Sequence, residues 1–198
     1  MPPEPSETLL TTAETWPYIC GTPRRIALNA WLTTNGISPH DIPVTTDLKV
    51  VESADGPVVD HYAFLRNADG FRYVDPNDPD QVAMEHRQLP CETLPPKSKR
   101  SDITTLALLQ CITDRTALRQ AMPLEDAIRT PTAWELLCTV YPDKVVTAAL
   151  FREVDRDLLD YGINVTYSFL TAEGVTRFLE LGGILHPQRA RTSFKEGA

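Results

Sequence analysis

The sequence predicts an α+β fold, in which a small antiparallel β-meander with one helix precedes an all-helical unit. Between residues 47 and 89, apolar and polar residues alternate with the period of two that half-buried strands show. Two Ala-Asp-Gly triplets, at 54–56 and 68–70, supply tight turns there. From residue 101 to 181, apolar residues recur every three or four positions, as in amphipathic helices. This change of period divides the chain into two units.

The first unit is expected to begin after a disordered N-terminus. Residues 1–15 are rich in Pro, Glu and Thr, a composition that disfavours a packed core. Thr22 and Pro23 then start a helix, because Thr favours the cap and Pro favours the first helical position. Apolar residues recur on one face of this helix as far as Gly36, which is a stop signal. We expect the helix to pack on one face of the meander.

The meander is expected to contain three strands, and a fourth where the alternation is weaker. These segments are residues 47–52, 58–66, 71–74 and, as the fourth, 82–89. Between the last two, residues 75–80 (DPNDPD) predict a rigid acidic loop. This loop lacks the ordered oxygen spacing and the central glycine of a calcium loop, so we expect no metal there.

A proline-rich segment marks the boundary between the two units. Residues 91–100 combine prolines with Lys and Arg in a polar run, which is typical of a linker. The predicted organisation is a disordered N-terminus, two modules and a tail. Its boundaries are 1–15, 16–90 (α+β meander module), 91–100 (linker), 101–184 (helical module) and 185–198 (tail).

The longest helical pattern follows Pro142, with Asp143 adding negative charge at the positive end of the helix. Apolar residues recur on one face up to Tyr161, and Gly162 is a natural left-handed cap, so a helix of about 20 residues is expected. Residues 164–170 are β-prone, and a closing helix follows them.

The order of these elements resembles the winged helix-turn-helix of MarR- and PadR-type regulators. The resemblance is carried by residues 158–162 (LLDYG) and 167–174 (YSFLTAEG). In that family the first segment would end the recognition helix, and the second would close the wing. The resemblance implies a nucleic-acid-binding surface built from basic residues. These are Lys144, Arg152, Arg156, Arg177, Arg189 and Arg191.

The charge distribution argues against nucleic acid as the partner. The net charge is −8, and residues 1–96 carry 14 acidic and 6 basic residues, whereas residues 97–198 carry 13 of each. Residues 141–163 carry three basic and five acidic residues, although a recognition helix needs cations to neutralise phosphates. An ordinary amphipathic helix, whose solvated face pairs Glu153 with Arg156, is therefore the alternative interpretation.

No catalytic, cofactor or metal signature stands in the sequence. A P-loop, G-x-G-x-x-G, G-x-S-x-G and H-E-x-x-H are all missing. His61 and His86 would meet across two strands, but nothing supplies the third ligand that a metal needs. We therefore expect no enzyme, no cofactor and no metal site.

The four cysteines are scattered and form no C-x-x-C pair. The sequence has no signal peptide and no apolar run long enough to cross a bilayer. A reduced, cytoplasmic protein that does not enter the membrane is expected.

These observations favour a non-enzymatic protein-binding or structural assembly protein. Its partner would be another protein or a second copy of the chain, and the alternative is a DNA-binding transcriptional regulator. The combination of short strand modules, Asp-Gly turns and a capped helical unit is similar to that of accessory proteins of actinobacterial phages and mobile elements.

Overall fold

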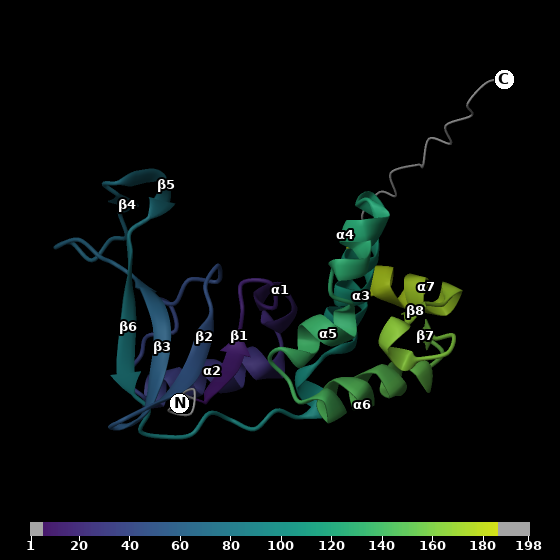
Figure 1. The fold of residues 1–198 in the computed structure, drawn as a ribbon, viewed down its shortest axis with the longest axis horizontal. Coiled ribbons are helices and arrows are strands. Elements are labelled where there is room, and N and C mark those ends of the chain that lie inside the picture. The colour runs from purple at the N-terminus through teal and green to yellow at the C-terminus, as the bar shows by residue number, and fades with distance from the viewer. Residues whose placement is uncertain (1–5, 186–198) are drawn as a thin grey trace.

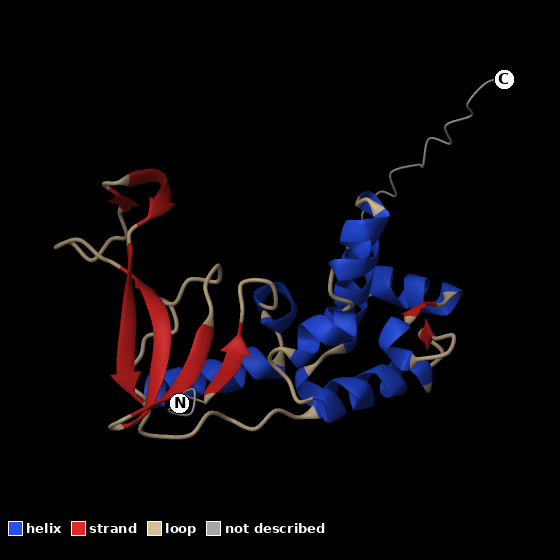
Figure 2. Ribbon diagram, in the orientation of Figure 1, coloured by secondary structure: helices blue, strands red, loops and turns tan. Residues whose placement is uncertain are grey.

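The computed structural model describes residues 6–185 and has a mixed α+β fold, as predicted. A four-stranded antiparallel sheet lies at one end and a group of helices at the other (Figures 1 and 2). The chain crosses between them along one side of the molecule, and an arm made of two helices rises from the helical end (Figure 1).

The sheet has the order β1-β2-β3-β6. Its strands are β1 (Glu7–Thr11), β2 (Leu48–Ser53), β3 (Gly56–Phe64) and β6 (Met84–Pro90). The first predicted Asp-Gly turn joins β2 to β3, where Ser53 lies opposite Gly56 and Gly56 has a φ of 110°. Only glycine adopts this backbone readily, so the turn fixes the register of the hairpin.

The predicted disorder of residues 1–15 is wrong for the described part of that segment. Residues 7–11 form β1, which pairs with β2, and Leu10 is buried beneath the sheet. A short helix, α1 (Trp16–Ile19), follows with Trp16 and Ile19 buried. Composition alone did not indicate this strand, because its apolar residues become buried only when β1 pairs with β2 in the folded sheet.

One face of the sheet is covered by α2 (Pro23–Thr34), as Figure 1 shows. Leu28 and Leu32 of this helix share a buried cluster with Leu48 and Val59 of the sheet. The predicted helix after Thr22 and Pro23 is therefore confirmed, and Gly36 ends it with a φ of 72°.

The predicted third strand, residues 71–74, is not part of the main sheet. Instead β4 (Val74–Asp75) and β5 (Asp78–Val82) form a separate hairpin within the expected acidic loop, and β6 pairs directly with β3. The cause lies in the Asn67 side chain, which accepts hydrogen bonds from the backbone N–H groups of Asp69 and Phe71. This turn directs the chain away from the edge of β3.

The helical end contains five α-helices, two short 3-10 turns and a small hairpin in the described residues. In order they are η1 (Arg100–Asp102), α3 (Thr105–Ala121), α4 (Leu124–Arg129), α5 (Ala133–Cys138), α6 (Asp143–Val154), β7 (Leu159–Asp160), η2 (Val165–Tyr167), β8 (Phe169–Leu170) and α7 (Ala172–Glu180). Side chains cap three of the helices: Thr104 for α3, Thr132 for α5 and Thr171 for α7.

The long central helix is shorter than predicted, because α6 ends at Val154 and not near Tyr161. Asp157 adopts the left-handed conformation, with a φ of 61°. The next N–H, that of Leu158, then bonds back to the carbonyl of Glu153. The left-handed position thus falls on an aspartate five residues before the expected glycine. The β-prone segment 164–170 likewise forms only η2 and the two residues of β8.

The predicted linker is held against α2. The indole Nε1 of Trp31 donates to the carbonyl of Thr93 at 2.7 Å, and Nη1 of Arg24 donates to the carbonyl of Pro96 at 2.6 Å. One buried cluster extends from Leu10 in the sheet to Phe178 in α7. The two predicted modules therefore share a continuous core.

None of the helices in residues 6–185 combines the length and the apolar character that crossing a bilayer requires.

Candidate protein-interaction surface

The basic residues expected to contact nucleic acid lie at separate places in the helical unit. Lys144 is exposed at the start of α6, and Arg177 pairs with Glu180 on α7 at 2.9 Å. Arg189 and Arg191 lie outside the described residues. Among the described members of this set, Arg152 on α6 and Arg156, two residues after the end of that helix, lie close together.

These two arginines bind the same internal carboxylate, that of Glu153. Arg152 Nε donates to Glu153 Oε1 at 2.6 Å, and Arg156 Nη1 approaches Oε2 at 3.3 Å. Thr105 adds a hydrogen bond from its hydroxyl at 2.9 Å. Glu153 is fully buried, so the expected position of this carboxylate on a solvated face is wrong.

Further hydrogen bonds hold the Arg152 guanidinium in the protein interior. Its Nη2 donates to the carbonyl of Ile103 at 2.8 Å and its Nη1 to that of Arg100 at 3.2 Å. A buried carboxylate needs both a counter-charge and hydrogen bonds, and these contacts supply them. Arg152 therefore joins α6 to the chain before α3, while half of the Arg156 side chain stays exposed.

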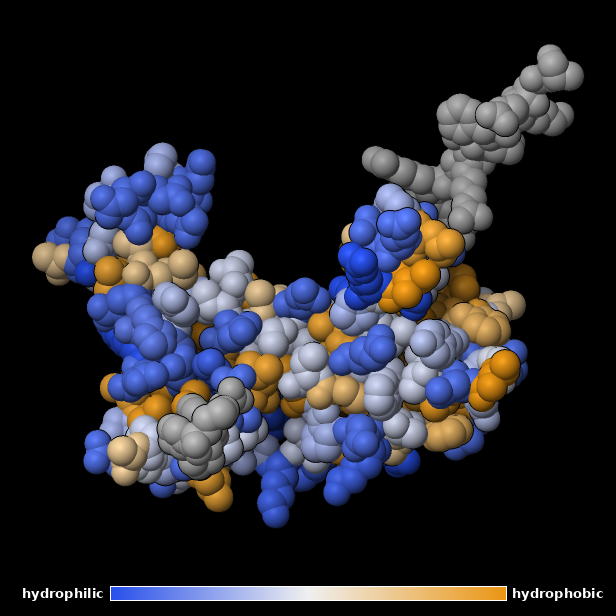
Figure 3. All heavy atoms as spheres, in the orientation of Figure 1, coloured by the Kyte–Doolittle hydropathy of each residue, from blue (hydrophilic) through white to orange (hydrophobic). Residues whose placement is uncertain are grey.

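The outer side of the same region is apolar. Four large side chains are exposed between α6 and β8, and we call them the β7–β8 apolar surface: Phe151, Ile163, Tyr167 and Phe169. Ile163 is fully exposed, and Phe151 meets Tyr161 edge to face with ring centroids 6.1 Å apart. Apolar atoms appear in orange at this end of the molecule in Figure 3, together with those of the α3 and α4 arm.

Two hollows lie on either side of Phe169, above α3. The first, about 170 Å³, is lined by Trp134, Tyr167 and Phe169 together with Arg115 and Arg119. The second, about 230 Å³, shares Ile112, Thr116 and Phe169 with the first and extends to Leu185. Phe169 therefore stands between two depressions, the first of mixed polar and apolar lining, and side chains of another protein can enter this shape.

Comparison with known proteins gives no match among family models, curated proteins or solved structures.

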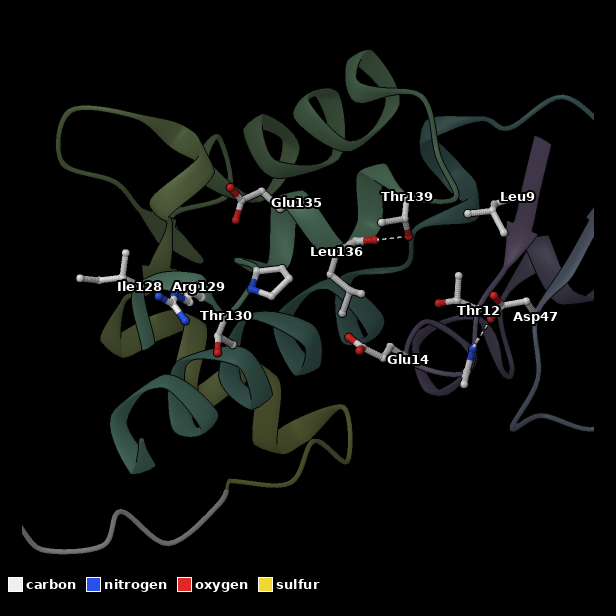
Figure 4. A pocket seen from close by; sticks show the side chains of 12 residues that line it. Leu9, Thr12, Glu14, Asp47, Ile128, Arg129, Thr130, Glu135, Leu136 and Thr139 are labelled. Carbon is white, nitrogen blue, oxygen red and sulfur yellow. Dashed lines mark hydrogen bonds between the residues drawn. The ribbon is translucent and has the colours of Figure 1, made fainter. Parts of the chain in front are cut away.

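A further hollow, of about 690 Å³, lies between the sheet and the helical unit (Figure 4). The carboxylates that line this hollow contact other groups of the same chain. Glu135 Oε2 accepts from the N–H of Thr132 at 2.7 Å, Asp47 accepts from the N–H of Ala13 at 3.3 Å, and Glu14 lies 3.4 Å from Arg115. Among the described residues, no Cys or His lines this hollow.

The histidines do not assemble a two-histidine site. His61 faces the core beneath α2 and is buried, whereas His86 lies on the opposite, exposed face. There His86 Nε2 lies 3.0 Å from Asp60 Oδ1, and Gln88 donates to the other oxygen of that carboxylate. This cross-strand pair depends on the register of β3 against β6, which the sequence did not reveal. In residues 6–185 no group of three or more His, Cys, Asp or Glu side chains is placed to hold a metal ion.

Three of the free cysteines, Cys91, Cys111 and Cys138, have thiols that burial keeps protonated at neutral pH because it raises the pKa of each. Burial raises the pKa of the Cys111 thiol, and it raises that of Cys138 to about 11. Since the thiolate is the reactive form, these cysteines behave as small apolar side chains.

The sequence contained a signal for the β7–β8 apolar surface that the helical pattern obscured. Tyr161, Ile163, Tyr167 and Phe169 follow one another around Gly162, but the prediction placed the first on a helix and the last two in a β-prone segment. Once α6 ends at Val154, these residues have too little neighbouring structure to be covered. The exposed surface thus follows from the early end of one helix.

Proposed function

We propose that this chain is a non-enzymatic protein-binding or assembly protein, and that the β7–β8 apolar surface contacts its partner. One observation carries the proposal: Arg152 and Arg156 bind the buried Glu153, while Phe151, Ile163 and Phe169 face solvent. Exposed apolar patches with a polar rim mark interaction sites in soluble proteins. A role in phage or mobile-element assembly would agree with the compositional similarity noted above.

The order of elements supports a winged-helix-like unit as the scaffold. A short turn containing Pro142 joins α5 to α6, the β7–β8 hairpin follows, and α7 packs behind it. In this arrangement α6 would occupy the position of the recognition helix and β7–β8 that of the wing. We propose that this unit serves protein binding.

The rim of the surface favours a protein partner over DNA. Asp155 and Asp157 are exposed in the turn between α6 and β7, and Asp160 is exposed at the end of β7. Phosphates would be repelled there, because DNA binding depends on cations that replace counterions. The matching partner is a protein segment with apolar side chains flanked by Lys or Arg.

Site-specific photo-crosslinking tests this proposal. A photoreactive amino acid at position 163 should capture one defined protein in cells of the source, and the same group at Val44 should not. Val44 is a suitable control because its exposed fraction, 50%, equals that of Phe169, and it precedes β2 at the other end of the molecule.

The captured partner would then be purified and its affinity for the full chain measured. Ile163→Asp and Phe169→Asp should each weaken binding about 30-fold or more, because charges would enter a desolvated contact. Val44→Asp should leave the affinity unchanged. Equal losses in all three variants would contradict the proposal.

A salt titration with mixed-sequence duplex DNA tests the regulator alternative. The protein-binding proposal expects no binding even at low ionic strength. Binding that weakens steeply with salt, and that Lys144→Ala and Arg156→Ala reduce, would show phosphate contacts and favour the alternative.

A further inference from the structure

A second surface is formed by the C-terminal half of α3 and by α4; its α3 part adjoins β7–β8, because Arg115 and Arg119 also line the first hollow beside Phe169. We call residues 115–130 the α3–α4 arm. It rises from the helical end of the molecule in Figure 1, and no residue between 113 and 131 is buried. Within the arm, Arg119 Nε donates to the carbonyl of Ala127 at 3.1 Å, and the Thr130 hydroxyl contacts the Met122 sulfur at 3.3 Å. The arm is thus ordered while contributing nothing to the core.

The arm nevertheless carries large apolar side chains. Leu124 is 76% exposed and Ile128 is 70% exposed, and Leu118 and Met122 of α3 are also exposed. Leu124 and Ile128 are four residues apart, so they lie on one side of α4. The hollow of Figure 4 runs beside α4, and its lining includes Ile128, so the same chain does not cover that side.

The stability of α4 is the first argument that another molecule covers the arm. An isolated helix shorter than about 12 residues is marginal in water, because nucleation costs more than a few hydrogen bonds return. With six residues and none of them buried, α4 gains little from its own chain. A partner that packs on Leu124 and Ile128 would supply the missing burial.

The charges of α4 identify that partner as a second copy of the chain. Glu125 and Asp126 lie in the first turn of α4, and Arg129 lies in its last turn. In the described part of the chain, none of these three side chains forms an ion pair or a hydrogen bond. Glu125 and Arg129 are four residues apart and flank the same side of the apolar pair, whereas Asp126 lies on the opposite side of the helix. When two copies of α4 lie antiparallel, Glu125 of each faces Arg129 of the other, and the apolar residues meet between them. Such a self-complementary surface fits a twofold dimer, in which both subunits use the same patch.

We propose that this protein is a homodimer whose subunits pack through their α3–α4 arms, with α4 against α4 in antiparallel orientation. No residue of α4 lines the hollows beside Phe169, so a contact between the two α4 helices leaves the β7–β8 apolar surface of each subunit free. Each dimer would present two copies of that surface, so a partner with repeated binding segments would be held more tightly than by one subunit.

Sedimentation velocity of the full-length protein over a range of concentrations tests this proposal. The wild-type protein should sediment as a dimer, and Ile128→Asp should raise the dimer dissociation constant about 30-fold or more. The matched control is Ile26→Asp on α2, because Ile26 is 71% exposed, almost the same as Ile128, and lies away from the arm. That variant should remain a dimer, as should Ile163→Asp.

A charge exchange tests the antiparallel orientation. Arg129→Glu and Glu125→Arg should each be monomeric alone and should form a heterodimer when mixed. Circular dichroism would verify that both variants keep their helices. A wild-type monomer at all concentrations, or a dimer that Ile128→Asp leaves intact, would overturn the proposal. The dimer and the partner surface can fail separately. If Ile128→Asp disrupts the dimer but Ile163→Asp leaves partner binding unaffected, the dimer is supported and only the proposed partner surface is contradicted.

Discussion

Glu153 is a fully buried carboxylate, and its surroundings decide whether it stabilises the fold. Glu153→Ala should lower the free energy of unfolding by about 3 kcal/mol, because it leaves the mostly buried Arg152 without its counter-charge. Urea denaturation at neutral pH measures this loss. The control is Glu180→Ala, which removes the exposed pair with Arg177 and should cost less than about 1 kcal/mol. Similar losses in the two variants would show that the interior network contributes no more than a surface pair.

His61 makes the stability of the sheet depend on pH. Burial lowers the pKa of its imidazole below the ordinary value of 6.5. In the unfolded chain the histidine binds a proton at about pH 6.5, whereas in the folded protein it stays neutral to lower pH. Stability should therefore fall as the pH drops below about 6.5, by up to about 1.4 kcal/mol per pH unit until the folded pKa is reached.

The variant His61→Gln isolates this effect from the other titrating groups. Denaturation midpoints of the wild type and of the variant would be compared between pH 8 and pH 5. The wild type should lose more stability than the variant over this range, since glutamine does not titrate. Parallel curves would mean that His61 takes up its proton equally in both states.

At the scale of elements, the predictions from the sequence are correct where one or two neighbouring residues determine the local structure. The helix start at Thr22 and Pro23, the closing helix after residue 170 and the Asp-Gly turn before β3 were all predicted correctly. Each depends on one or two residues whose preferences hold in any fold. Sequence was therefore sufficient to predict the fold class and the main hairpin.

The errors occur where an element depends on distant partners. The strand β1 exists because β2, over thirty residues later, pairs with it. The end of α6 depends on Asp157, a residue type that only sometimes takes the left-handed conformation that glycine takes readily. The β7–β8 apolar surface follows from that early end, so the candidate site was missed for the same reason.

The contact between α7 and β7 gives an element-scale prediction at Gly174. A Cβ atom added there would lie 1.9 Å from the carbonyl oxygen of Leu158. Helix propensity favours alanine over glycine by about 1 kcal/mol, but the backbone clash should outweigh it. Gly174→Ala should therefore destabilise the protein by about 2 kcal/mol, measured by urea denaturation.

The matched control for this prediction is Gly162→Ala. Nothing lies within 4 Å of a Cβ at that position, and its φ is not positive. The substitution should be neutral or slightly stabilising, because it reduces the freedom of the unfolded chain. A stable Gly174→Ala variant would mean that α7 can shift away from β7 at little cost.

At the scale of the whole molecule, contacts between the sheet end and the helical end bear on whether the predicted modules act separately. The Tyr18 hydroxyl of α1 donates to Asp114 of α3 at 3.0 Å, and Trp31 holds the connecting segment at Thr93. The buried cluster includes residues of both ends without a break. A continuous core means that neither half can unfold without exposing apolar surface of the other.

The full-length protein should therefore unfold in a single cooperative transition. In differential scanning calorimetry, the calorimetric enthalpy should equal the van't Hoff enthalpy, as it does for single domains. Separate fragments 1–96 and 97–198 should lack stable tertiary structure, because each loses half of the shared core and the first loses the anchoring of Tyr18 on α3. Two resolved transitions, or a fragment that melts cooperatively on its own, would show instead that the boundary at residues 91–100 separates independent domains. The expected outcome is one transition, since hydrogen bonds to Trp31 and Arg24 hold that segment against α2 as part of the packed structure.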